Sequence, residues 1–102
     1  AAANADWSNS DHYFVVITDQ HGADSWPIAG STFVLIPTQP NDEAATKEAL
    51  KFFAWAFTPK GDAMAAGLDY VPMPAKVVEG IKKVWASDIK NSGGQPLFAA
   101  SN

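Results

Sequence analysis

The sequence predicts an α/β fold with two strands and three helices. Two short runs of β-branched and aromatic residues, Tyr13 to Thr18 and Thr32 to Ile36, lie between polar or proline-containing stretches, which is typical of strands. In the second half of the chain, apolar residues recur every three or four positions, which indicates amphipathic helices. The 102 residues are enough for one small domain with a hydrophobic core.

The composition argues against several kinds of function. Lysine supplies all seven positive charges, and eleven acidic residues outnumber them, so the net charge is -4. Because the chain has no arginine and no basic patch, nucleic-acid binding is disfavoured. The absence of cysteine excludes disulfides, thiolate catalysis and thiolate metal sites. No apolar run approaches the roughly 20 residues that a membrane-spanning helix needs.

The second predicted strand differs from the first in its pattern. It follows a stiff corner at Trp26-Pro27 and ends at Pro37, which cannot continue a ladder. Its apolar residues are continuous, which favours burial on both faces, as in a central strand of an α/β sheet.

The first predicted helix covers Glu43 to Phe57. Asn41 or Asp42 is placed to cap its N-terminus, and Glu43 and Lys47 have the spacing of an i,i+4 ion pair. Its predicted apolar face contains Leu50, Phe53 and Phe57.

Two further helices are expected. The residues Thr58 to Gly61 interrupt the first helix, and Asp62 to Leu68 form a short second one. The stretch "LDYVPMP" is extended, because each proline disfavours a helical conformation in the residue before it. The third helix starts with Pro74 in its first turn and ends near Lys90. Its apolar stripe contains Val77, Val78, Ile81, Val84, Trp85 and Ile89.

These elements do not make a self-sufficient fold. Two strands alone form a marginal sheet, and the helices have wide apolar faces with little sheet to cover them. The mismatch predicts that further strands are supplied from outside this stretch of chain.

Five stretches of the sequence, in this order, carry a specific resemblance: "AAANADWS", "WPIAGSTFVLI", "ALKFFAWAF", "LDYVPMP" and "VWASDIKNSGGQPLF". Together they resemble the C-terminal third of the periplasmic phosphate-binding proteins of high-affinity phosphate ABC transporters. The resemblance extends over nearly the whole chain and is weakest at residues 9–20.

The resemblance implies the C-terminal portion of a two-lobed type II periplasmic-binding-protein fold. Residues 1–25 would then end the second lobe, residues 26–31 would form the inter-lobe crossing, and residues 32–102 would complete the first lobe. The hinge would include Trp26, Pro27, Ile28 and Gly30.

The implied function is non-enzymatic capture of inorganic phosphate in the periplasm and its delivery to a membrane permease. In this family, backbone N–H groups, Ser and Thr hydroxyls, an Arg and an Asp hold the phosphate, and they lie in the first two-thirds of the sequence. No direct phosphate ligand is therefore expected here, which agrees with the absence of arginine. Within this chain, Ser31 and Thr32 are candidates for lining the phosphate-binding cleft without a direct bond to phosphate. No catalytic residue, metal site or cofactor is expected.

Other readings of individual residues remain open. A polar set around the first predicted strand could bind a metal or act in acid–base chemistry, although solvated loop roles are favoured; it comprises Asp11, His12, Asp19, His21 and Asp24. The stretch Gly30 to Thr32 could form an anion nest, although a hinge or strand entry is favoured. An aromatic set could be a ligand platform, although core packing is favoured; it comprises Phe52, Phe53, Trp55 and Trp85.

Two alternatives concern the whole chain. It could be an interaction module that self-associates or complements an N-terminal fragment, because its helices have wide apolar faces. It could also be a small hydrolase using Asp19, His21 and Asp24, a reading that no recognisable catalytic spacing supports.

Overall fold

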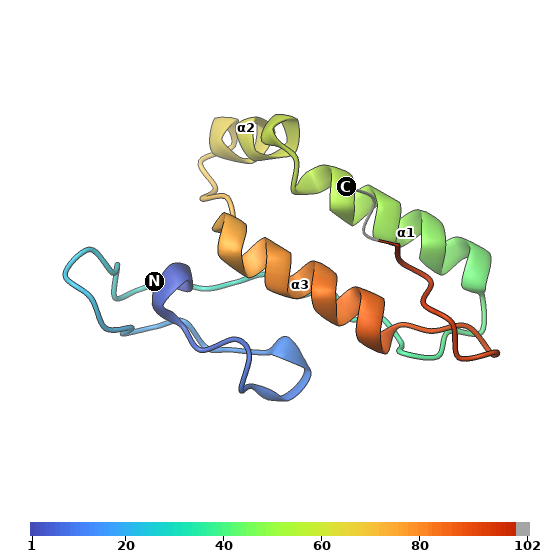
Figure 1. The fold of residues 1–102 in the computed structure, drawn as a ribbon. Helices are drawn as coiled ribbons and strands as arrows, with labels where there is room; N and C mark the ends of the chain where they lie inside the picture. The colour runs from blue at the N-terminus through green and yellow to red at the C-terminus, as the bar shows by residue number, and fades with distance from the viewer. Residues whose placement is uncertain (100–102) are drawn as a thin grey trace.

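A computed structural model describes residues 1–99 of the chain. Two single-turn 3₁₀ helices, η1 and η2, are followed by three α-helices (Figure 1). The bounds are η1 Ala2–Asn4, η2 Asp11–Tyr13, α1 Glu43–Ala56, α2 Pro59–Gly67 and α3 Ala75–Asp88. The part of the chain before α1 forms an irregular arm along one side of α3, and α2 extends from the end of α1 (Figure 1).

The two predicted strands are not present in the described part of the chain. Residues 14–17 and 31–36 have no regular secondary structure, and the β-pairing within residues 1–99 is an isolated antiparallel bridge between Lys90 and Pro96. A strand exists only when a neighbouring strand accepts and donates its backbone hydrogen bonds, and neither segment pairs with the other. The prediction of two strands was therefore wrong for this chain taken by itself.

Helix α1 begins as the sequence predicts. The Asp42 side chain accepts a hydrogen bond from the backbone N–H of Ala45 at 2.9 Å, which satisfies one of the free donors of the first turn. The predicted pair between Glu43 and Lys47 does not form. Instead, the Glu43 carboxylate accepts a hydrogen bond from the backbone N–H of Ser92 at 3.0 Å, and so ties the C-terminal stretch to the start of α1.

The junction between α1 and α2 is tighter than predicted. The expected helix break forms the start of α2, because the Thr58 hydroxyl accepts from the Gly61 N–H at 3.4 Å and Pro59 occupies the first helical turn. Gly61 is buried, and a side-chain carbon there would collide with the Ala56 carbonyl. The close approach of the two helices therefore requires glycine at this position.

Helix α3 carries both hydrophobic clusters of the described chain. It starts one residue after Pro74 and ends at Asp88, two residues before the predicted end. The first cluster joins the N-terminal arm to the start of α3, and its buried members are Trp7, Ile17 and Val77. The second joins α1 to the C-terminal stretch at the far end of α3, and its buried members are Leu50, Ile89 and Leu97.

The aromatic residues divide between these clusters and the surface. Trp85 is half-buried, with its ring centroid 6.1 Å from that of Phe57 and 5.2 Å from that of Phe98. Phe53 is half-buried on the same face of α1 as Leu50, as predicted. Core packing was the wrong prediction for Phe52 and Trp55, which are exposed because they lie on the opposite face of α1.

The molecule is open for its size. Its accessible surface is 7507 Å², whereas a folded monomer of 10.9 kDa has about 5,600 Å². Its radius of gyration is 14.7 Å, against about 13 Å for a compact domain of this length. Within residues 1–99, no helix is both long enough and apolar enough to cross a membrane.

Candidate functional site

The candidate site begins at a loop that ends in the predicted hinge. The backbone N–H of Asp19 donates to the carbonyl of Pro27 at 3.0 Å, which closes the loop between them. Asp19 has a φ of +50°, a left-handed conformation that Asp tolerates better than most residues. The corner at residues 26 and 27 is therefore held at a fixed distance from the end of the first predicted strand.

Asn4 in η1 anchors the same loop. Its side-chain amide donates to the His21 carbonyl at 2.9 Å and to the Ser25 hydroxyl at 2.8 Å, and this hydroxyl donates to the His21 carbonyl at 2.7 Å. Gly22 allows the approach, because it has a φ of +107° and a side-chain carbon there would lie 2.6 Å from the Asn4 nitrogen. Sequence reasoning missed this anchor, since its members are up to 21 residues apart.

The predicted hinge residues form an exposed apolar corner. Trp26 is 72% exposed and Ile28 is 83% exposed, so neither side chain packs into a core of this chain. Gly30 has open space around it and a φ outside the left-handed region, so the conformation here does not require glycine. The structure thus shows a corner with apolar surface that the chain itself does not cover.

Ser31 and Thr32 line an apolar groove of about 620 Å³. One wall is residues 31–38, and the opposite wall comes from α1 and α3 through Phe53, Val84 and Trp85. Thr32 is exposed, whereas the Ser31 hydroxyl oxygen is buried and has no hydrogen-bond partner among the described residues. Such an oxygen is costly to leave unpaired.

The N-terminal arm contributes aromatic rings that pack beside the groove. The ring centroid of Phe33 lies 4.7 Å from that of Phe14 and 6.4 Å from that of Trp7, which in turn lies 5.7 Å from that of Tyr13. The Tyr13 phenol lies directly over Gly80 of α3, where a side-chain carbon would collide with it. Burial raises the pKa of Tyr13 above its usual value of 10.0.

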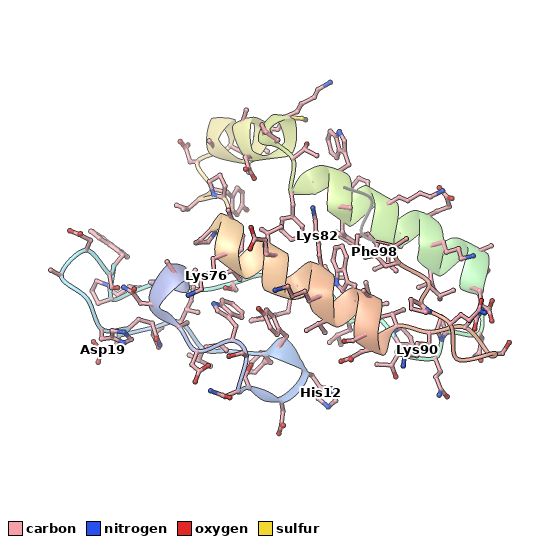
Figure 2. All side chains as sticks on the ribbon, in the orientation of Figure 1. His12, Asp19, Lys76, Lys82, Lys90 and Phe98 are labelled. Atoms are coloured by element: carbon pink, nitrogen blue, oxygen red, sulfur yellow. The ribbon has the colours of Figure 1, made fainter. Side chains whose placement is uncertain are left out.

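The groove lacks the chemistry of a complete anion site. The titratable side chains along it are His12, Tyr13 and Asp88, and no lysine lines it. A neighbouring hollow of about 740 Å³ has mixed charge, because Lys76 and Lys83 share it with Asp6, Glu79 and Asp88. The labels in Figure 2 show Lys76 and Lys82 spaced along α3.

The five polar residues around the first predicted strand do not converge. His12 and Asp19 lie far apart along the N-terminal arm (Figure 2), and among residues 1–99 no group of three His, Asp or Glu side chains could hold a metal ion. Nearby, Asp6 accepts two hydrogen bonds from Asn9, which lower the pKa of this exposed carboxyl. This arrangement is a local turn rather than an acid–base pair.

Three known proteins that are similar to this chain are phosphate-binding proteins of one kind. The chain is 44% identical over 90 residues to the phosphate-binding protein PstS of Xylella fastidiosa strain Temecula1. The aligned region covers 88% of this chain and 24% of that protein. It is 37% identical over 98 residues to PstS of Pasteurella multocida, covering 96% and 28% respectively. It is 40% identical over 90 residues to PstS of Haemophilus influenzae, covering 88% and 27%. No protein-family model matches the chain.

These relatives are phosphate-binding proteins, and the homology implies a periplasmic-binding-protein fold. In particular, the chain is homologous to the C-terminal portion of PstS. It spans about a quarter of the length of the relatives that it matches.

Proposed function

We propose that this chain is the C-terminal segment of the phosphate-binding component of a phosphate ABC transporter. The observation that carries the proposal is the 37–44% identity to PstS proteins over nearly the whole chain. The complete protein would capture inorganic phosphate in the periplasm and deliver it to a membrane permease, without acting as an enzyme.

Within that protein, the segment supports the fold and the hinge. Residues 1–25 end one lobe, residues 26–31 cross between lobes, and residues 32–102 complete the other lobe. The anchored loop that ends at Pro27 supports this assignment, because it holds the start of the crossing rigidly while the side chains of Trp26 and Ile28 stay exposed. Trp26, Pro27, Ile28 and Gly30 are the proposed hinge residues, since a few residues at element ends can absorb lobe closure.

The direct phosphate ligands come from the portion outside this chain. The sequence has no arginine, so the segment cannot supply a bidentate guanidinium clamp for an anion, and no lysine lines the groove. Ser31 and Thr32 remain the only candidates here for lining the cleft, and we assign them no direct bond to phosphate.

A chimeric protein tests this proposal. The chain replaces the matching C-terminal portion of Xylella fastidiosa PstS, and isothermal titration calorimetry measures phosphate binding by the chimera. We expect a Kd within about tenfold of the parent protein. We also expect Ser31→Ala and Thr32→Val to change the Kd by less than about threefold, which is under 1 kcal/mol.

Two results would count against the proposal. A chimera that folds cooperatively but does not bind phosphate would contradict the assignment to phosphate capture. A loss of about thirtyfold or more in Ser31→Ala would mean that this segment does supply a ligand, because a lost hydrogen bond to a charged group costs about 1.5–3 kcal/mol.

A second candidate is an interaction module that self-associates. The exposed apolar side chains at the corner and along the groove favour it, and Leu35 is 94% exposed. Sedimentation equilibrium over a range of concentrations decides this question. A strictly monomeric chain at the highest concentration would exclude self-association.

A further inference from the structure

Two neighbouring residues of η2, His12 and Tyr13, have a left-handed backbone. Their φ angles are +53° and +59°. Histidine adopts this conformation more readily than most residues, but a bulky residue such as tyrosine does so rarely. Such strain persists only where the surrounding structure holds it in place, and it concentrates at functional positions. Specific contacts must therefore hold the turn at Tyr13.

Hydrogen bonds close the chain on both sides of this turn. The Ser10 hydroxyl donates to the Trp7 carbonyl at 2.7 Å, and the backbone N–H of Phe14 donates to the Asp11 carbonyl at 3.1 Å. The N-terminal arm lies along α3 (Figure 1), and the turn places the Tyr13 ring against that helix. The strained backbone thus aims one aromatic side chain at one helix.

The Tyr13 ring fits over Gly80, the only glycine of α3. A side-chain carbon at Gly80 would collide with the Tyr13 hydroxyl oxygen and lie 3.0 Å from the ring carbon that carries it. A glycine inside a helix lowers stability relative to alanine, so the close approach of the ring gives this glycine a structural reason. Trp7 stacks on Tyr13, with ring centroids 5.7 Å apart. We call the contact of Trp7, Tyr13 and Gly80 the arm latch.

A buried apolar cluster continues the arm latch along α3. Trp7 and Ile17 from the arm and Val77 from the helix are each at most 6% exposed. Ala29, within the proposed crossing, packs against the same cluster. Closely packed clusters have discrete arrangements and do not slide continuously. The arm and α3 therefore move together or separate completely.

This packing joins segments that the proposed function assigns to different lobes. Residues 1–25 end one lobe, whereas α3 belongs to the other. A rotation of the lobes that separated the arm from α3 would expose Trp7 and Ile17 to water, which is unfavourable. A rotation about the arm latch leaves both side chains buried, and the exposed residues of the crossing can absorb the backbone change.

We propose that the arm latch is a fixed inter-lobe contact about which the two lobes close, and that it positions them for the capture of inorganic phosphate. Tyr13 and Gly80 are then positioning residues that make no contact with phosphate. The proposal rests on the proposed function, because it takes the division into lobes and the ligand from it.

Nuclear Overhauser effects test whether the arm latch stays closed. The signal between the Tyr13 ring protons and the Gly80 α protons is measured in the chimera described above, before and after saturation with inorganic phosphate. We expect the signal in both states. Its loss on addition of phosphate would mean that the lobes separate at this contact, and its absence in both states would mean that the complete protein does not form the latch. Either result overturns the proposal.

A matched pair of glycine variants tests the positioning role. Gly80→Ala places a carbon under the Tyr13 ring, whereas Gly67→Ala adds one in open space. Calorimetry is carried out at a temperature at which circular dichroism shows each variant of the chimera to be folded. We expect Gly80→Ala to raise the Kd for phosphate by about 3- to 30-fold, because only part of the population then has the competent arrangement. Gly67→Ala should change it by less than about twofold. A merely structural contact would lower the Tm and leave the Kd of the folded protein unchanged, so an unchanged or lower Kd in Gly80→Ala overturns the proposal.

Variants of Tyr13 test whether Gly80 acts through the ring. Tyr13→Ala should raise the Kd to a similar extent, and it carries the test if Gly80→Ala does not fold. Adding Gly80→Ala to Tyr13→Ala should cause no further rise, because the ring that the new carbon would meet is gone. Tyr13→Phe keeps the ring that stacks on Trp7, so its Kd should stay within about threefold of that of the unsubstituted chimera. A full additional rise in the double variant would contradict the proposed contact.

Failure of the arm latch can be distinguished from failure of the proposed function. An unsubstituted chimera that folds but does not bind phosphate removes the proposed function and the positioning role together. A chimera that binds phosphate, with the same Kd in Gly80→Ala and Tyr13→Ala, keeps the proposed function and removes the positioning role alone.

Discussion

Leu50 is the residue whose replacement most sharply tests the packing of this chain. Its side chain is 0% exposed and lies against Ile89 and Leu97, so it joins α1 to the end of α3 and the C-terminal stretch. Replacing it with alanine leaves a hole between three segments that are far apart in sequence. The cost of the substitution depends on how far these three segments can collapse into the hole.

The expected cost follows from the buried volume. Leu50→Ala removes three carbon groups worth about 0.8 kcal/mol each, and the residual cavity adds to this, giving about 3–4 kcal/mol, within the usual range for buried leucines. Domains of this size have a free energy of unfolding of about 5–15 kcal/mol. Because the described core has only six buried hydrophobic residues, we expect a value near the lower limit, so the variant loses most of its stability.

Urea unfolding followed by circular dichroism at the helix signal measures this cost. Leu68→Ala is the matched control, because Leu68 is 71% exposed and should change the free energy of unfolding by less than about 0.5 kcal/mol. If the two variants had equal effects, or Leu50→Ala cost less than about 1 kcal/mol, the cluster at the end of α3 would not hold this chain together.

Three further predictions concern the close contacts of the fold. Gly61→Ala should lower the free energy of unfolding by about 1–3 kcal/mol, because the added side-chain carbon collides with the end of α1. Gly67 has open space around it, so Gly67→Ala should be neutral or slightly stabilising in the same unfolding assay. Equal changes in the two variants would refute the tight junction. Gly22→Ala should cost more than about 1 kcal/mol because of its positive φ, and an unchanged midpoint of unfolding would contradict the anchored loop. Burial raises the pKa of Tyr13 in the folded chain, so its neutral phenol contributes stability that is complete below pH 10 and is lost as the pH rises through the raised pKa. In the variant Tyr70→Phe, which leaves Tyr13 as the one tyrosine, the phenolate absorbance should therefore titrate with a midpoint above pH 10. A midpoint at or below pH 10 would contradict the burial of Tyr13.

The helices were predictable because their signals are local. The apolar period and the Asp42 cap located α1 and α3 to within two residues. The start of α2 was missed although Thr58-Pro59 is itself a start signal, with a capping hydroxyl followed by proline. The residue types at Thr58 and Pro59 were sufficient to predict the start of α2, but the sequence analysis interpreted them only as the end of α1.

The strands could not be predicted for this chain, because a strand depends on a partner. The residue types of Ser31 to Ile36 suit a sheet, yet no described residue pairs with this segment. The mismatch between helices and strands, however, correctly indicated apolar surface without cover. Phe52 and Trp55 are part of this uncovered apolar surface. The sequence analysis favoured core packing for both residues, and this prediction was wrong.

The candidate site was only partly predictable. The sequence predicted a corner at Trp26-Pro27, where the Trp26 side chain is exposed in the structure, and the role of these residues as a hinge stays a prediction. The hydrogen bonds of Asn4 that fix the preceding loop depend on tertiary structure and have no sequence motif. The roles of Ser31 and Thr32 stay predictions, because Thr32 is exposed and the Ser31 hydroxyl has no partner among the described residues.

Titration of the isolated chain with inorganic phosphate, by isothermal calorimetry on a sample shown to be monomeric, tests the central claim most directly. The chain has no arginine, and its groove has no lysine. We therefore predict no binding heat at millimolar phosphate, although the chimera with the N-terminal portion of PstS binds. Millimolar or tighter binding by the monomeric chain alone would contradict the account, because the segment would then hold phosphate ligands of its own.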